Sequence, residues 1–88
     1  MKLVFMTSFL KDISKIKSNA TLKRIKDVIE SIEKTEDIQS ISYLKKLRGV
    51  DRYYRIKVGE YRIGLSSAEN TLIFVRCLHR KDIYRYFP

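Results

Sequence analysis

The chemistry available to this chain lies in arginine, lysine and tyrosine side chains gathered in its second half. Arg55 and Lys57 alternate with apolar residues in the segment 53–58, and Arg62 follows shortly after a Gly-Glu pair. Guanidinium and ammonium groups neutralise phosphates, and tyrosine rings stack on bases. The set also includes Tyr53, Arg76, Arg80, Tyr84 and Tyr86. A sheet face with cations and interleaved aromatic rings suits single-stranded RNA, so we interpret the set as a candidate polyanion site.

The net charge also favours a polyanionic partner. The 88 residues carry 19 Lys+Arg against 10 Asp+Glu, a formal net charge of +9. Residues 1–40 hold 8 basic and 6 acidic side chains, a net of +2, whereas residues 41–88 hold 11 and 4, a net of +7. A basic surface also keeps small proteins soluble, and any single arginine fits a solvated sheet face. The asymmetry of the whole set favours a binding surface.

Several classes of catalytic site are excluded. The chain has one histidine, His79, and one cysteine, Cys77, so no Ser-His-Asp or Cys-His arrangement and no disulfide can be argued. A glycine-rich phosphate loop and metal-ligand spacing are missing, so we expect no metal and no cofactor. The length excludes a large enzyme with a deep pocket. Any catalysis must therefore rest on cations that stabilise charge on a phosphate. Cys77 lies in an apolar run, where a buried, inert thiol is expected.

The elements that position these residues begin with a strand over residues 3–5 and two helices. Ser8 and Asn19 are plausible N-caps of the first and second helix. The first helix repeats apolar residues at every third position: Leu10, Ile13 and Ile16. The second carries one apolar stripe: Leu22, Ile25, Val28, Ile29 and Ile32. The two helices form a hairpin whose apolar seam must lie on a sheet.

The rest of the chain has strand periodicity. We expect strands over 43–47, 53–58, 61–65 and 71–78, with a type II′ turn at Gly59-Glu60 and a second turn over 66–70. The tail over 79–88 is too short for a substantial helix. The predicted fold is α+β: an N-terminal strand and a two-helix hairpin packed on one face of an antiparallel sheet of about four strands. Residues 1–88 form a single domain in this prediction.

The sequence also favours a cytoplasmic protein without a membrane partner. No stretch approaches the roughly 20 apolar residues that span a bilayer. The apolar run near the N-terminus is too short for a signal peptide, because Lys11 and Asp12 follow closely.

Three segments, in this order, resemble the RelE/ParE toxins of bacterial type II toxin–antitoxin systems. They are residues 45–49, 54–63 and 79–84, which read Lys-Lys-Leu-Arg-Gly, Tyr-Arg-Ile-Lys-Val-Gly-Glu-Tyr-Arg-Ile and His-Arg-Lys-Asp-Ile-Tyr. The resemblance covers nearly the whole chain and is densest from residue 43 onward. It implies a ribosome-dependent endoribonuclease that cleaves mRNA in the decoding site. Resemblance to the RelE branch further implies that the 2′-hydroxyl of the mRNA attacks the adjacent phosphate and leaves a cyclic phosphate.

The resemblance also implies roles for individual residues. Lys57 and Arg62 match basic residues of the family's hairpin strands, Arg80 matches the arginine after the last strand, and Tyr84 matches a tyrosine that stacks on a base or assists proton transfer. Arg55 departs from the family, where lysine is frequent, and guanidinium is a poor general base. Lys57 can be the base only where neighbouring cations favour its neutral form. The expected catalytic residues are Lys57, Arg62, Arg80 and Tyr84. The expected RNA-binding residues are Lys45, Lys46, Arg48, Arg55, Arg76, His79, Lys81 and Tyr86, with His79 a second candidate for protonating the 5′ oxygen.

The partners implied by the resemblance are an acidic antitoxin protein and mRNA on the ribosome, including contacts with rRNA. Oligomers are expected only through the antitoxin complex. Two other readings remain open. One is a ParE-like DNA gyrase inhibitor on the same fold without nuclease activity, and the other is an inert relative that binds RNA or titrates antitoxin.

Overall fold

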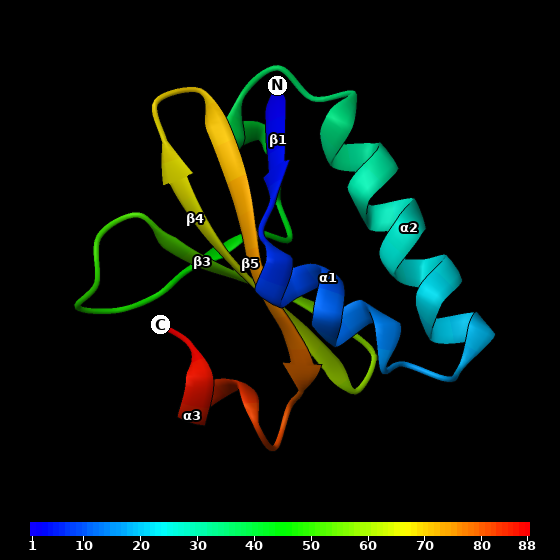
Figure 1. Cartoon of the computed structure of the whole chain (residues 1–88). Helices are drawn as coiled ribbons and strands as arrows, with labels where there is room; N and C mark the ends of the chain where they lie inside the picture. The colour runs from blue at the N-terminus through cyan, green and yellow to red at the C-terminus, as the bar shows by residue number, and fades with distance from the viewer.

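The computed structural model describes all residues, 1–88, as one mixed sheet with helices on both faces. The elements are β1 (Lys2–Phe5), α1 (Thr7–Ser14), α2 (Asn19–Glu33), a 3-10 turn (Ile38–Ser40), β2 (Lys45–Lys46), β3 (Tyr53–Val58), β4 (Tyr61–Ala68), β5 (Thr71–His79) and α3 (Ile83–Tyr86). Figure 1 shows α1 and α2 on one side of the sheet, and α3 with the C-terminus on the other. No helix combines the length and apolar character needed to cross a membrane.

The sheet has five strands in the order β1-β5-β4-β3-β2. The strands from β2 to β5 are antiparallel, but β1 runs parallel to β5. The predicted α+β fold is confirmed, and β2 to β5 form the expected antiparallel sheet of four strands. The difference is that β1 joins this sheet as a fifth, parallel strand at its edge. The direction of β1 could not be predicted, because the whole helical hairpin and the β2–β4 meander separate it from β5 in the sequence.

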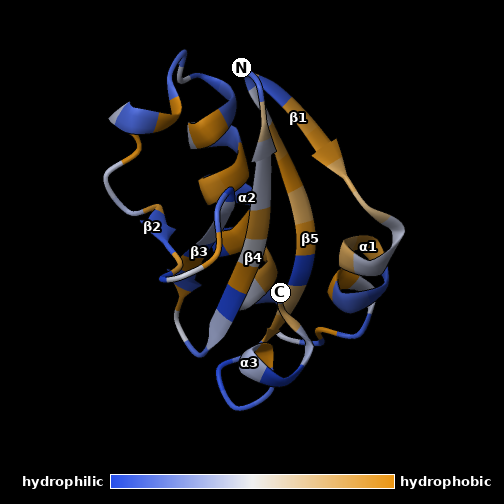
Figure 2. Ribbon diagram, turned by 90° about the vertical axis from the view of Figure 1, so that its left-hand side faces the viewer, coloured by the Kyte–Doolittle hydropathy of each residue, from blue (hydrophilic) through white to orange (hydrophobic).

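The main core lies between α1, α2 and one face of the sheet. The predicted stripe of α2 is confirmed, with Ile25 and Ile32 buried and the other three residues packed against the cluster. From the sheet, Ile56, Ile63 and Leu72 are almost fully buried against them. In Figure 2 the hydrophobic colour runs along much of β1 and β5.

Of the apolar residues predicted for the first helix, Ile16 is buried and Ile13 packs against the core, as expected, but Leu10 does not. Phe9 is 2% exposed and Asp12 6%, whereas Leu10 is 54% exposed. Phe9 packs in an aromatic cluster with Phe5 and Phe74, at ring-centroid distances of 5.8 and 5.4 Å. These contacts turn the helix so that Leu10 faces outward.

Both predicted N-caps are also corrected. The residue before α1 is Met6, and the hydroxyl of Ser8 donates to the carbonyl of Val75 at 2.6 Å instead of capping the helix. The cap of α2 is Ser18, whose hydroxyl accepts from the backbone N–H of Thr21 at 3.2 Å. Asn19 is therefore the first residue of the helix.

The strand bounds differ from the prediction at two places. The strand expected over 43–47 is reduced to the two residues of β2, and β4 continues through Ala68, so the second turn is only Glu69-Asn70. At the first turn Gly59 has φ +59° while Glu60 stays outside the positive region, as a type II′ turn requires. The predicted hairpin is confirmed.

A β-bulge in β5 decides which side chains face away from the helices. Gly64 pairs with Arg76, but the next residue of β4, Leu65, pairs with Phe74, so Val75 is an extra residue. An extra residue reverses the alternation of faces beyond it. Phe74 and Cys77 therefore both face the core, while Arg76 lies on the opposite face with Gly64.

The C-terminal segment covers part of that opposite face. Ile83 and Phe87 are buried, and a side chain added at Gly64 would meet the Phe87 ring. The Phe87 ring also packs edge-on against Tyr53, with centroids 5.6 Å apart. The tail was expected only to be basic and aromatic, but through Ile83 and Phe87 it also forms a small apolar contact on this face, separate from the main core.

We predict that Gly64→Ala destabilises the protein. A Cβ at this position would lie 2.6 Å from two ring carbons of Phe87, closer than van der Waals contact allows. We expect a loss of about 1–3 kcal/mol of unfolding free energy, measured by urea denaturation. Ser66→Ala, in the same strand, is the control. In a Phe87→Ala background the Gly64→Ala penalty should nearly vanish, and an equal penalty in both backgrounds contradicts the contact.

Candidate nucleic-acid interface

Two cations stand directly opposite each other on the sheet face away from α1 and α2. Lys57 of β3 pairs in register with Arg62 of β4. Like charges at directly opposite positions destabilise a sheet. The Nη1 of Arg62 donates to the carbonyls of Gly59 and Tyr61 at 2.8 and 2.9 Å, whereas Lys57 is exposed and forms no ion pair. This pair can be stabilised by an anion bound between its members.

A second row of side chains crosses the same face two residues farther along the strands. By register it contains Lys45, Arg55, Gly64 and Arg76. The short helix α3 lies along this row. The Tyr84 ring is 5.6 Å from the Cζ of Arg55, and the Tyr86 ring is 5.5 Å from the Cζ of Arg76. Phe87 sits over Gly64 between these two cation–π contacts.

A basic cleft of about 570 Å³ opens beside β2 and β3. It is lined by Tyr43, Lys45, Lys46, Leu47, Arg48, Arg55 and Lys57. The Nε of Arg55 is buried without a hydrogen-bond partner, which leaves one donor unused. Lys46 lies 3.9 Å from the exposed carboxylate of Asp51. Five cations in one cleft suit the successive phosphates of a nucleic acid strand.

Tyr43 lines this cleft as well, although it was not among the predicted site residues. Its hydroxyl donates to the Ser31 hydroxyl at 3.1 Å, which ties the ring to the C-terminal half of α2. Its position in the sequence could have marked it as a site residue, because it lies two residues before the Lys-Lys-Leu-Arg-Gly segment, in a half of the chain where tyrosines stand close to basic residues.

Arg80 and His79 follow each other in sequence, and both lie near the carboxylate of Glu60. Arg80 is held at the β3–β4 turn, where its Nε lies 2.8 Å from Glu60 and its backbone N–H donates to the Glu60 carbonyl at 2.8 Å. His79 pairs with Tyr61 on the helix-covered side, and its Nδ1 accepts from the backbone N–H of Lys81 at 3.2 Å. The Nε2 of His79 also lies 3.8 Å from the same Glu60 oxygen, so both side chains lie beside this turn, although by register His79 is on the sheet face away from Lys57 and Arg62.

The aromatic residues of the tail are available at the surface. Tyr84 is 64% exposed and Tyr86 53%, although each ring lies beside an arginine. Lys81 is exposed in the turn before α3. No group of three or more histidine, cysteine, aspartate or glutamate side chains is placed to hold a metal ion.

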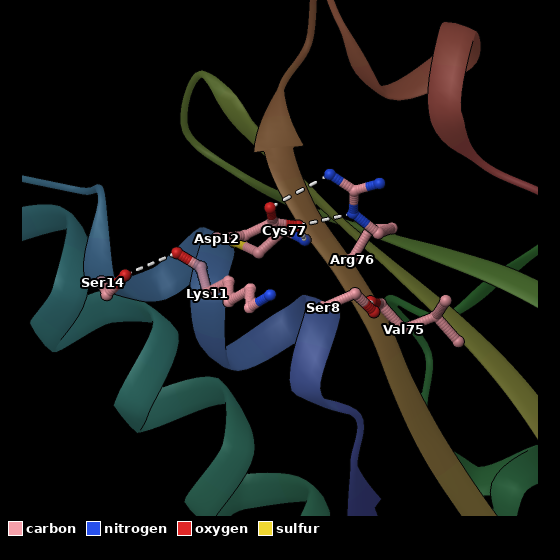
Figure 3. A network of polar contacts seen from close by, with 7 residues as sticks. All are labelled: Ser8, Lys11, Asp12, Ser14, Val75, Arg76 and Cys77. Carbon is pink, nitrogen blue, oxygen red and sulfur yellow. Dashed lines mark hydrogen bonds and ion pairs between the residues drawn. The ribbon is translucent and has the colours of Figure 1, made fainter.

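Arg76 differs from the other cations because a buried carboxylate holds it (Figure 3). The Oδ2 and Oδ1 of Asp12 accept from the Nε and Nη2 of Arg76 at 2.8 and 3.1 Å. This hydrogen bonding raises the pKa of Arg76 against the opposing effect of its burial. Asp12 was missed in the sequence analysis. Its signal was an acidic residue three positions after Phe9, on the buried stripe of an amphipathic helix.

Comparisons with known proteins show which proteins this chain resembles. Residues 3–84 match the family model described as the ParE toxin of type II toxin–antitoxin system, parDE. The chain is 43% identical over 89 residues to Toxin RelE3 of Methanocaldococcus jannaschii, with 100% of both chains covered.

Solved structures are similar over most of the chain. A chain of the RelB-RelE antitoxin-toxin complex from Methanococcus jannaschii has a TM-score of 0.82 at 41% identity, covering 97% of this chain and 99% of that one. A chain of the archaeal RelE-RelB complex from Pyrococcus horikoshii has a TM-score of 0.70 at 17% identity, covering 90% and 93%. The second similarity concerns the fold alone.

We predict that Cys77 is inert in the folded protein. It is 1% exposed, and burial, together with the nearby Asp12, raises the pKa of its thiol to about 12. The thiolate, which is the reactive form, is therefore suppressed at neutral and mildly basic pH. Mass spectrometry after treatment with iodoacetamide at pH 8 should show no modification of the native chain and full modification in urea.

The same shift has a consequence for stability. Because the pKa of Cys77 is higher in the folded than in the unfolded chain, its contribution to folding is fully present below the ordinary thiol pKa. It is lost as the pH rises through about 12.

Equal alkylation rates with and without urea at pH 8 would contradict the burial of this thiol.

Proposed function

The chain belongs to the RelE/ParE family of toxins of type II toxin–antitoxin systems, and we propose that it is a ribosome-dependent endoribonuclease that cleaves mRNA in the decoding site and so inhibits translation. The observation that carries this proposal is the directly opposed Lys57–Arg62 pair, flanked by the basic cleft and the exposed ring of Tyr84. Two cations at directly opposite positions of neighbouring strands can together face the concentrated charge of a reacting phosphate.

The proposed reaction uses the substrate's own nucleophile. The 2′-oxygen of one nucleotide attacks the adjacent phosphorus, the bond to the 5′ oxygen breaks, and a cyclic phosphate remains. The general base that removes the 2′ proton is Lys57 or Tyr84. Arg62 and Arg80 neutralise the charge that develops on the phosphate and the leaving 5′ oxygen, which takes up a proton from solvent as it departs. This chemistry needs no metal, because the nucleophile is already within the substrate and side chains supply the positive charge.

The basic cleft is the proposed binding site for the RNA strand that flanks the reacting phosphate. Lys45, Lys46, Arg48 and Arg55 line it, and Lys81 lies exposed after β5. The solved M. jannaschii relative is a toxin in complex with the antitoxin RelB. We propose that this chain likewise binds a cognate acidic antitoxin, which its charge of +9 favours, and that it forms oligomers through that complex.

The first test is Arg62→Ala under inducible expression, with the 5′ ends of cellular mRNA mapped. Removing one donor to a developing anion typically costs about 10²–10³ in rate, so cleavage of translated mRNA should disappear. Lys23→Ala, an exposed cation on α2, is the control and should cleave as the wild type does. Growth arrest with intact mRNA and inhibited DNA supercoiling would refute the nuclease and support a gyrase inhibitor.

The second test separates the two roles proposed for Tyr84. If its hydroxyl transfers a proton, Tyr84→Phe should slow single-turnover cleavage on programmed ribosomes by about 10²–10⁴ while binding is unchanged. Tyr84→Leu should additionally weaken binding, because the stacking surface is lost. A wild-type rate for Tyr84→Phe would exclude the hydroxyl from proton transfer and leave stacking as its role.

A further inference from the structure

We propose that Asp12 and Arg76 are positioning residues that hold the short helix α3, and with it Tyr84, in place over the sheet. Arg76 then acts through Tyr86 instead of binding RNA. The kinetic part of this inference rests on the proposed nuclease function, but its structural part does not.

The first observation is how α1 closes an open strand edge. β1 pairs with β5 only up to Phe74, so beyond that point β5 has a neighbouring strand, β4, on one edge only. Side chains of α1 take over its polar groups, as Figure 3 shows. The Ser8 hydroxyl donates to the Val75 carbonyl at 2.6 Å, and Asp12 accepts from the backbone N–H of Cys77 at 2.9 Å. Asp12 is thereby fixed in a buried position against β5.

The second observation is that Asp12 fixes the orientation of Arg76. Two parallel hydrogen bonds join the carboxylate to the guanidinium, an arrangement that determines direction as well as distance. A buried carboxylate needs these bonds, because removing one partner leaves an uncompensated charge. The Nε and one N–H of Nη2 are therefore occupied by the carboxylate, which fixes the plane of the guanidinium. Its flat face remains, and the ring of Tyr86 lies 5.5 Å from the Cζ.

The third observation is that α3 is too short to be stable without contacts to the rest of the protein. It has four residues, far fewer than an isolated helix needs for stability in water. Ile83 and Phe87 bury their side chains, and Tyr84 and Tyr86 each contact one arginine of the same row, Arg55 and Arg76. Releasing the Arg76 end frees α3 to rotate about its apolar contacts, which moves Tyr84 off Arg55.

The test compares Asp12→Asn with Asp27→Asn. Both remove one carboxylate charge from a helix, but Asp27 is an exposed residue paired with Lys23. Hydrogen exchange of the Phe87 amide, which donates to the Ile83 carbonyl, reports whether α3 is docked, independently of any enzymatic activity. We expect about tenfold faster exchange in Asp12→Asn and no change in Asp27→Asn.

A second variant keeps the test decisive if Asp12→Asn does not fold. Tyr86→Leu leaves the buried ion pair intact and removes only the ring that lies on Arg76. It should also accelerate exchange of the Phe87 amide. Unchanged exchange in Tyr86→Leu would overturn the proposal, whatever the protein does to RNA.

The kinetic readout distinguishes positioning from RNA contact. Arg76→Lys keeps the charge but cannot form the two-pronged contact with Asp12. We expect it to lower kcat on programmed ribosomes about tenfold or more with KM unchanged, together with faster exchange in α3. If Arg76 instead binds a phosphate, Arg76→Met should weaken RNA binding, reduce the salt dependence of binding by about one counterion, and leave exchange in α3 unchanged. That combination overturns the proposal.

Discussion

The buried carboxylate of Asp12 is the contact on which the arrangement of both sheet faces depends. It accepts three hydrogen bonds, two from the Arg76 guanidinium and one from the Cys77 backbone. These bonds compensate for the burial of its charge and fix α1 against β5 where β1 no longer covers the edge. The same contact reaches from the helix-covered side to the face that carries Tyr86. One residue of the first helix thereby links the N-terminal half of the chain to its last turn.

The sheet face opposite α1 and α2 carries charges that do not stabilise the fold. Lys57 and Arg62 oppose each other directly, and the row beside them carries further cations separated by Gly64. The absence of a side chain at Gly64 gives Phe87 its place, so an apolar contact holds the tail among cations. Like charges kept together at a cost in stability are characteristic of a binding site. A phosphate would supply the missing counter-charge in the proposed function.

Local regularity explains which predictions succeeded. The apolar stripe of α2 repeats with the period of a helix, and the alternation from Tyr53 to Ile63 repeats with the period of a strand. The helix, the hairpin and the sheet face on which each side chain lies could therefore be predicted. The α1 prediction held at Ile13 and Ile16 but failed at Leu10, because the charged Asp12 occupies a buried position next to Phe9 and hides that part of the apolar face. The direction of β1 and the bulge at Val75 were also beyond periodicity, since both depend on pairing with distant strands.

The sequence by itself determined the class of the molecule: a basic α+β protein whose Arg55, Lys57 and Arg62 share the face away from the helices. Those properties follow from composition and from contacts between neighbours in the chain. Only the tertiary structure decided that Arg76 forms an ion pair with Asp12 and that His79 lies on the opposite sheet face from Lys57. It also decided that the C-terminal segment packs over Gly64. Each of these depends on residues brought together across a strand edge or a bulge. Contacts of this kind cannot be predicted from residue spacing, because they join residues that are far apart in the sequence and depend on how the whole chain packs.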